Sequence, residues 1–159
     1  MCGTHGCAIA PQHRASVSSL QAKAEPPTPP SGYFFAGPKA RFDSEITPID
    51  TPLNKRFAIV HRRGTLSAVV NICPHQGAPL HKGAVTDIED MGIVWGSAIV
   101  CRVHGWNFDV ETGACGSTRF VIDTFDVKVE GGNVFVSLQP KNASTQGPRR
   151  DFGGKESEM

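Results

Sequence analysis

Apolar and polar residues alternate along residues 125–138 with the period of two that marks a half-buried β-strand. In residues 125–138 the alternating positions flank Gly131-Gly132-Asn133, a sequence that favours a tight turn. In residues 57–72 two apolar runs flank Gly64, which can take the positive φ that a tight hairpin turn requires. We therefore predict two β-hairpins, and we expect the one at 125–138 to have one buried face.

Shorter signals add further strands. The aromatic run Tyr33-Phe34-Phe35 favours a short strand, and apolar residues precede two cysteines at 69–72 and at 99–100. No segment between residues 32 and 139 offers more than two turns of amphipathic helix. Short strands at close spacing predict an all-β domain built as a small sandwich or barrel.

The ends of the chain lack these patterns. Residues 1–31 are rich in Ser, Ala, Pro and Gly, and residues 140–159 are polar and glycine-bearing. Neither composition favours a packed core. We predict a disordered N-terminal arm over 1–31, one domain over 32–139 and a flexible C-terminal tail over 140–159.

Composition narrows the cellular context. The net charge is +1, with 16 basic and 15 acidic side chains, so neither nucleic acid nor a membrane surface is expected as a partner. No apolar run reaches the length of about 18 residues that suggests a membrane span. Five cysteines favour a reducing compartment over a disulfide framework. We expect a cytoplasmic protein; an organelle matrix is the alternative, because the arm carries Arg14 and Lys23 and no acidic residue before Glu25, as a transit segment would. In either compartment the sequon Asn142-Ala143-Ser144 is a chance match.

Two short boxes, CPHQGAPL at residues 73–80 and CRVHGWNFD at residues 101–109, each offer one thiolate and one imidazole. The candidate metal ligands are Cys73, His75, Cys101 and His104. This ligand set suits one zinc ion, and it also suits a binuclear iron centre with both thiolates on one iron and both imidazoles on the other. The mixed pair in each box favours the binuclear centre, because structural zinc fingers usually pair like ligands.

The pattern C-x-H-x-G-x-x-L followed by C-x-x-H-G-W-x-F-D resembles that of the Rieske domain family, and the likeness extends over residues 58–138. The resemblance implies an all-β fold, a Rieske-type β-sandwich with a smaller cluster-binding subdomain over residues 71–115. It also implies one [2Fe–2S] cluster, with glycine turns at its loops. The implied ligands are Cys73 and Cys101 on the inner iron and His75 and His104 on the outer, more exposed iron.

Four residues near the boxes indicate the kind of Rieske protein. In the high-potential members of the family, cysteines stand in place of Ala78 and Val103, and hydroxyl-bearing residues stand in place of Trp106 and Phe108. Fewer O–H donors to the cluster sulfurs leave the oxidised state relatively more stable. We therefore predict no disulfide between the loops and a midpoint potential near the low end, about −150 mV, of the Rieske range.

The pair Gly105-Trp106 is similar to the Rieske domains of oxygenases, but residues 105–159 contain no histidine to hold a mononuclear iron. We expect an electron carrier and not an enzyme. The spacer 76–100 resembles that of soluble Rieske-type ferredoxins of eukaryotes. Such a ferredoxin takes single electrons from a flavoprotein or other reductase and passes them to an oxidase or oxygenase. The alternatives are the small Rieske-like subunit of assimilatory nitrite reductase and a redox or iron-status sensor.

Other residues with metal-binding chemistry have plainer interpretations. A possible knuckle in the N-terminal arm has no strand to hold it and is interpreted as chance; it comprises Cys2, His5 and Cys7. Cys115 is expected to be a free thiol, and His81 a solvated loop histidine. Trp106 and Phe108 are expected to pack beneath the cluster.

Overall fold

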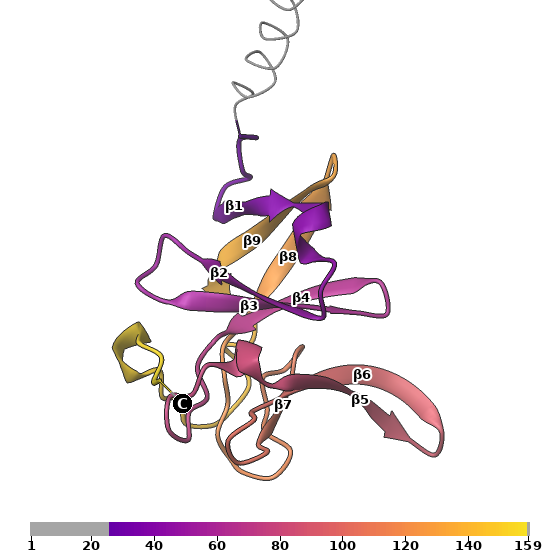
Figure 1. Ribbon diagram of the computed structural model, residues 1–159, viewed down its shortest axis with the longest axis vertical. Coiled ribbons are helices and arrows are strands. Elements are labelled where there is room, and N and C mark those ends of the chain that lie inside the picture. The colour runs from indigo at the N-terminus through magenta and orange to yellow at the C-terminus, as the bar shows by residue number, and fades with distance from the viewer. Residues whose placement is uncertain (1–25, 159) are drawn as a thin grey trace, which may run out of the picture.

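The computed structural model describes residues 26–158, which form nine strands in two antiparallel sheets (Figure 1). The larger sheet has the order β1-β9-β8-β4-β3-β2 and the smaller one the order β5-β6-β7. The strands are β1 (Tyr33–Pro38), β2 (Ile46–Asp50), β3 (Arg56–Arg62), β4 (Thr65–Val70), β5 (Ala84–Asp90), β6 (Ile93–Val100), β7 (Asn107–Asp109), β8 (Thr124–Glu130) and β9 (Asn133–Pro140). Short 3₁₀ segments are η1 (Lys39–Phe42), η2 (Leu80–Lys82) and η3 (Phe152–Gly154).

The larger sheet folds over on itself to make the predicted sandwich. Strands β4 and β8 pair over only two positions, so the halves β1-β9-β8 and β4-β3-β2 diverge around a common core (Figure 1). Phe57 of β3 stacks on Phe125 of β8 with ring centroids 4.0 Å apart, and Phe34 of β1 lies 5.9 Å from Phe57. Burial of each such ring stabilises the fold by roughly 1.5–3 kcal/mol. Three aromatic rings therefore join the two halves.

Both predicted hairpins are confirmed. Strands β3 and β4 are joined at Arg63 and Gly64, and β8 and β9 at Gly131 and Gly132. All four turn residues have positive φ, from 54° at Arg63 to 78° at Gly132. Two-residue turns of this kind match the right-handed twist of paired strands. The predicted strand at Tyr33 is also present, as β1.

The smaller sheet is built on a hairpin that the hydrophobic pattern did not predict. Strands β5 and β6 pair along most of their length and project from the body of the molecule (Figure 1). Asp87 of β5 accepts hydrogen bonds from Arg63 at 2.7 Å and from Arg62 at 3.0 Å. These two arginines hold the pKa of Asp87 well below its usual range. The ion pairs therefore connect the hairpin to the β3–β4 turn.

The segment that follows β9 is held to the body of the molecule through a buried amide, that of Asn142. Asn142 is 4% exposed; its amide nitrogen donates to the carbonyls of Thr112 and Ile122, both at 2.8 Å, and its side-chain oxygen accepts from the Thr124 N–H. Arg149 then donates to the Asn142 carbonyl at 2.8 Å. An amide engaged in this way is not free for glycosylation, which agrees with a chance sequon.

Three expectations from the sequence remain outside these observations. The boundaries of arm, domain and tail remain predictions. The candidate knuckle residues Cys2, His5 and Cys7, and the transit-like segment, lie outside the described residues. Between residues 26 and 158, no helix is long and apolar enough to cross a membrane.

Candidate metal centre

The two boxes fold into loops with the same backbone closure. In the first loop, the Cys73 N–H donates to the Ala78 carbonyl at 2.9 Å, and the Gly77 N–H donates back to the Cys73 carbonyl at 2.8 Å. In the second loop, the Cys101 N–H donates to the Trp106 carbonyl at 2.8 Å, and the Gly105 N–H donates to the Cys101 carbonyl at 2.9 Å. Each loop turns through its glycine, at φ 77° and 74°.

A third turn repeats this closure between Asp109 and Ala114, with Gly113 at φ 76°. The amides of Gly77, Gly105 and Gly113 donate to carbonyls inside their own turns. These glycine amides are therefore used in shaping the loops.

The candidate thiols lie at the bottom of the loops. Cys73 is fully buried, and Cys101 is 2% exposed. Burial raises the pKa of Cys73 to about 12; the His75 backbone opposes this shift, and the neighbouring Cys101 adds to it. A thiolate in such a site needs a cation beside it, and iron supplies that charge.

The candidate imidazoles lie nearer the surface. The rings of His75 and His104 are 4.3 Å apart between centroids, at 62° to each other. His104 is exposed and His75 is half-buried. The Nδ1 atom of His75 is buried and has no hydrogen-bond partner among the described residues. An unpaired buried ring nitrogen is costly unless it binds something, and it is a good iron ligand.

The chemistry of the four candidate residues fits a two-iron group. A binuclear cluster spreads its protein ligands over two irons, two on each. The buried thiols, the exposed imidazole edge and the unpartnered Nδ1 agree with that arrangement.

An aromatic stack supports His75. Trp106 lies parallel to the His75 ring, with centroids 4.3 Å apart and planes 8° apart. Phe120 in turn stacks on Trp106, with ring centroids 5.6 Å apart. Phe108 is fully buried in the core. Phe108 therefore packs in the core and Trp106 packs against a candidate ligand, while the expected position of both residues beneath the cluster stays a prediction. The sequence held no signal for this stack beyond the presence of the aromatic residues.

Two further residues near the loops, Cys115 and His81, have side chains that can bind metals. Cys115 is a free thiol, as expected, and neither Cys73 nor Cys101 forms a disulfide. Burial opposes ionisation of Cys115, but hydrogen bonds from Thr118 and Ser117 lower its pKa overall.

His81 is not the solvated histidine that the sequence suggested. It is half-buried, its Nδ1 lies 2.8 Å from the Asn71 amide nitrogen, and its backbone N–H donates to Asn71 at 2.7 Å. The cause is local, because His81 lies in η2 and contacts Asn71, the residue directly after β4, through both its ring and its backbone N–H.

Known proteins resemble this chain in sequence and in fold. The Rieske [2Fe-2S] domain family matches residues 41–125. The ferredoxin component of the alkene monooxygenase system of Xanthobacter autotrophicus (strain ATCC BAA-1158 / Py2) is 31% identical over 100 residues, which cover 62% of this chain and 75% of that protein. The chain therefore belongs to the Rieske [2Fe-2S] domain family, and its cofactor is one [2Fe–2S] cluster.

Solved structures agree on the fold. The ferredoxin of Sphingomonas yanoikuyae B1 is 25% identical with a TM-score of 0.53, over 67% of this chain and 98% of that one. The ferredoxin of carbazole 1,9a-dioxygenase from Nocardioides aromaticivorans IC177 is 22% identical with a TM-score of 0.56, over 69% of this chain and 100% of that one. A putative NADH-dependent nitrite reductase small subunit from Mycobacterium tuberculosis is 17% identical with a TM-score of 0.59, over 67% and 95%. Within its family, the chain is a Rieske-type ferredoxin, a carrier of single electrons.

Proposed function

We propose that this ferredoxin holds its cluster through Cys73, Cys101, His75 and His104, and that it carries electrons from a reductase to an oxygenase. The observation that supports the ligand assignment is the repeated loop closure, together with the two neighbouring buried thiols and the two imidazole rings 4.3 Å apart. When bound, the cluster supplies a one-electron redox couple. The protein contributes the ligands, the burial of the thiols and the exposed imidazole edge.

The exposure of the two imidazoles suggests where electrons enter and leave. His104 is exposed while both thiols are buried, so a partner approaches the cluster most closely from the imidazole side. The relative from Xanthobacter is the ferredoxin component of an alkene monooxygenase system. By that likeness, the acceptor of this chain is an oxygenase, the donor a flavoprotein reductase, and the chain itself catalyses no reaction on a substrate. The nitrite reductase alternative has support at the level of fold alone.

The ligand assignment is tested by single substitutions in the purified holoprotein. We expect Cys73→Ser, Cys101→Ser, His75→Ala and His104→Ala each to reduce cluster content at least tenfold, by iron and sulfide analysis and visible absorbance. Two matched controls are available. Cys115→Ser removes another buried thiol, and His61→Ala removes a histidine of β3; both should leave two irons per chain. A cluster retained in any ligand variant, or lost in either control, would refute the assignment.

The carrier role is tested by kinetics. Dithionite-reduced protein should give the rhombic EPR signal of a centre with mixed sulfur and nitrogen ligands. With NADPH or NADH and a flavoprotein reductase, the oxidised protein should be reduced repeatedly and re-oxidised by an oxygenase component. A protein that is reduced once and then only binds a partner would be a sensor and would contradict the carrier role.

A further inference from the structure

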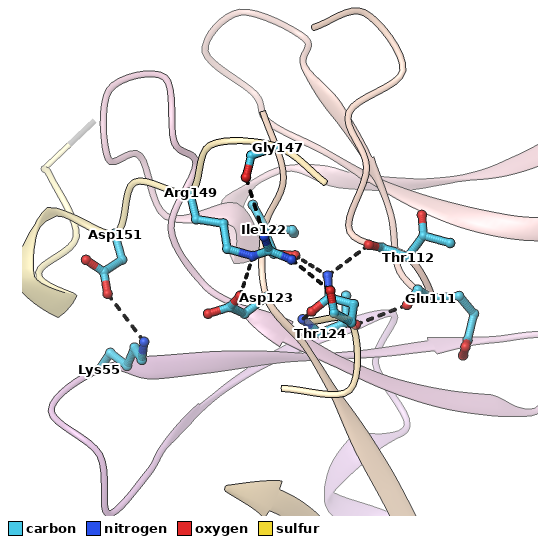
Figure 2. Close-up of polar contacts among 10 residues, drawn as sticks. Lys55, Glu111, Thr112, Ile122, Asp123, Thr124, Gly147, Arg149 and Asp151 are labelled. Atoms are coloured by element: carbon cyan, nitrogen blue, oxygen red, sulfur yellow. Dashed lines mark hydrogen bonds and ion pairs between the residues drawn. The ribbon is translucent and has the colours of Figure 1, made fainter. Parts of the chain in front are cut away.

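The last described residues, 151–158, cross the outside of the first ligand loop, and we call them the C-terminal strap. The first ligand loop is residues 73–79. The strap begins just after Arg149, which donates to Asp123 at 2.8 Å (Figure 2). Asp151 then pairs with Lys55 at 3.3 Å (Figure 2). The strap is thus held to the body of the protein before it reaches the loop.

Two residues of the strap contact the loop at Gly77. The Ser157 N–H donates to the Gly77 carbonyl at 2.8 Å. The Phe152 ring covers the same residue so closely that a Cβ on Gly77 would lie 3.3 Å from the ring. Phe152 itself has a φ of 52°, a conformation that bulky residues rarely adopt. Contacts of the strap therefore hold Phe152 in an unfavourable backbone conformation over the loop.

A third strap residue holds the base of the loop. The Glu156 carboxylate accepts two hydrogen bonds from the Arg56 guanidinium and one, at 3.0 Å, from the amide of Asn71. Asn71 is fully buried and also accepts from the His81 N–H. Asn71 and His81 flank the loop on either side. Glu156 therefore fixes the two ends of the loop through one buried amide.

The second ligand loop, residues 101–106, has no hydrogen bond to the strap among the described residues. Its Trp106 stacks on His75 of the first loop and on Phe120. Among the described residues, the strap thus forms hydrogen bonds to only one of the two loops. Residues 101–106 therefore serve as an internal reference in any experiment on the strap.

We propose that the C-terminal strap is a positioning element for the first ligand loop, with Glu156 and Phe152 as its positioning residues. The loop is fixed at both ends through Asn71 and at Gly77, so His75, which lies between, keeps its ring against Trp106 and its Nδ1 directed inward. The inference rests on the proposed ligand role of His75. The strap therefore governs how firmly the cluster is held and the electronic signature of the imidazole-bound iron.

The test compares holoprotein variants of the strap. They are Glu156→Ala, Phe152→Ala and a chain ending after Arg150. Glu156→Asp is the conservative variant, and Glu45→Gln is the matched control, since it removes an exposed ion pair with Arg62 that involves neither the strap nor the loop. The readouts are the rate of cluster loss into a chelator, the EPR g-values, and hydrogen exchange in peptides covering 73–79 and 101–106.

We expect Glu156→Ala and Phe152→Ala to lose the cluster roughly tenfold faster, as happens when groups that orient a metal ligand are removed. Exchange should rise in 73–79 and stay unchanged in 101–106, the g-values should shift, and Glu156→Asp should recover most of the difference. Unchanged exchange in 73–79, or an equal rise in both loops and throughout the sandwich, would overturn the proposal. If the chain carries no cluster at all, the proposed function fails, but exchange in 73–79 of the cluster-free variants still decides the role of the strap.

Discussion

A methyl group added at Gly113 should destabilise the protein far more than the same group added at Gly64. Both glycines have a φ of +76°, so the backbone strain of an alanine is the same at the two positions. They differ in the space around them. A Cβ on Gly113 would lie 2.0 Å from the Ile122 carbonyl oxygen and 2.4 Å from the Asn142 amide nitrogen, whereas a Cβ on Gly64 meets nothing within 4 Å.

The size of the difference follows from the contacts that must move. Strain at positive φ costs about 1–2 kcal/mol in both variants. In Gly113→Ala, overpacking against a backbone carbonyl adds about 1–3 kcal/mol. The shift also weakens the hydrogen bonds from the Ile122 N–H to the Gly113 carbonyl and from Asn142 to Ile122, worth about 1 kcal/mol each. Gly113→Ala should therefore be less stable than Gly64→Ala by about 3–5 kcal/mol.

Thermal unfolding of the two holoproteins, followed by circular dichroism at equal cluster content, measures this difference. At 2–4 °C for each kcal/mol, the melting temperature of Gly113→Ala should lie about 10 °C below that of Gly64→Ala. Melting temperatures within about 3 °C of each other would show that the third turn can move away from β8 at little cost. The steric reasoning would then be wrong.

Three further predictions concern stability, acid sensitivity and redox potential. Asn142→Ala leaves three backbone groups without their partner, so the free energy of unfolding should fall by about 3 kcal/mol. The control Asn133→Ala, in the β8–β9 hairpin, should change it by less than about 0.5 kcal/mol. Equal effects of the two substitutions in urea unfolding would contradict this prediction. Burial, with Arg56 nearby, lowers the pKa of His81, so the unfolded chain binds a proton more readily than the folded chain. The stability from neutral His81 is therefore present above its unfolded pKa, near 6.5, and is lost as the pH falls below that value. The difference in melting temperature between wild type and His81→Gln should shrink as the pH falls from 8 to 5. A difference that grows instead would show that the pKa of His81 is raised on folding. Redox titration should give a midpoint near about −150 mV, the low end of the Rieske range, and a value well above zero would contradict the role given to the missing hydroxyl donors.

Local signals made much of the fold predictable. The β3–β4 and β8–β9 hairpins were predictable because apolar runs in the first, alternation in the second and a glycine turn in each lie within a few residues. The β5–β6 hairpin was missed because its register is broken by a bulge between Ile88 and Glu89, and its turn uses Met91 at positive φ. What holds it is the contact of Asp87 with two arginines far away in sequence. Such contacts leave no mark on the hydrophobic pattern.

The candidate site was also predictable only in part: the ligands were, and the residues that support them were not. The reason is chemical. Thiolates and imidazoles are restricted in type and spacing, because few side chains bind iron and a loop must aim them at one point. The groups that orient the ligands obey no such restriction: Trp106 contributes a flat face, Gly77 the absence of a side chain, and Glu156 an acceptor from a polar, glycine-bearing tail. Many residues could serve these ends, so only the folded chain shows which ones do. Because Glu156 meets Arg56 across 100 positions of sequence, the orientation of His75 depends on residues that no motif would include.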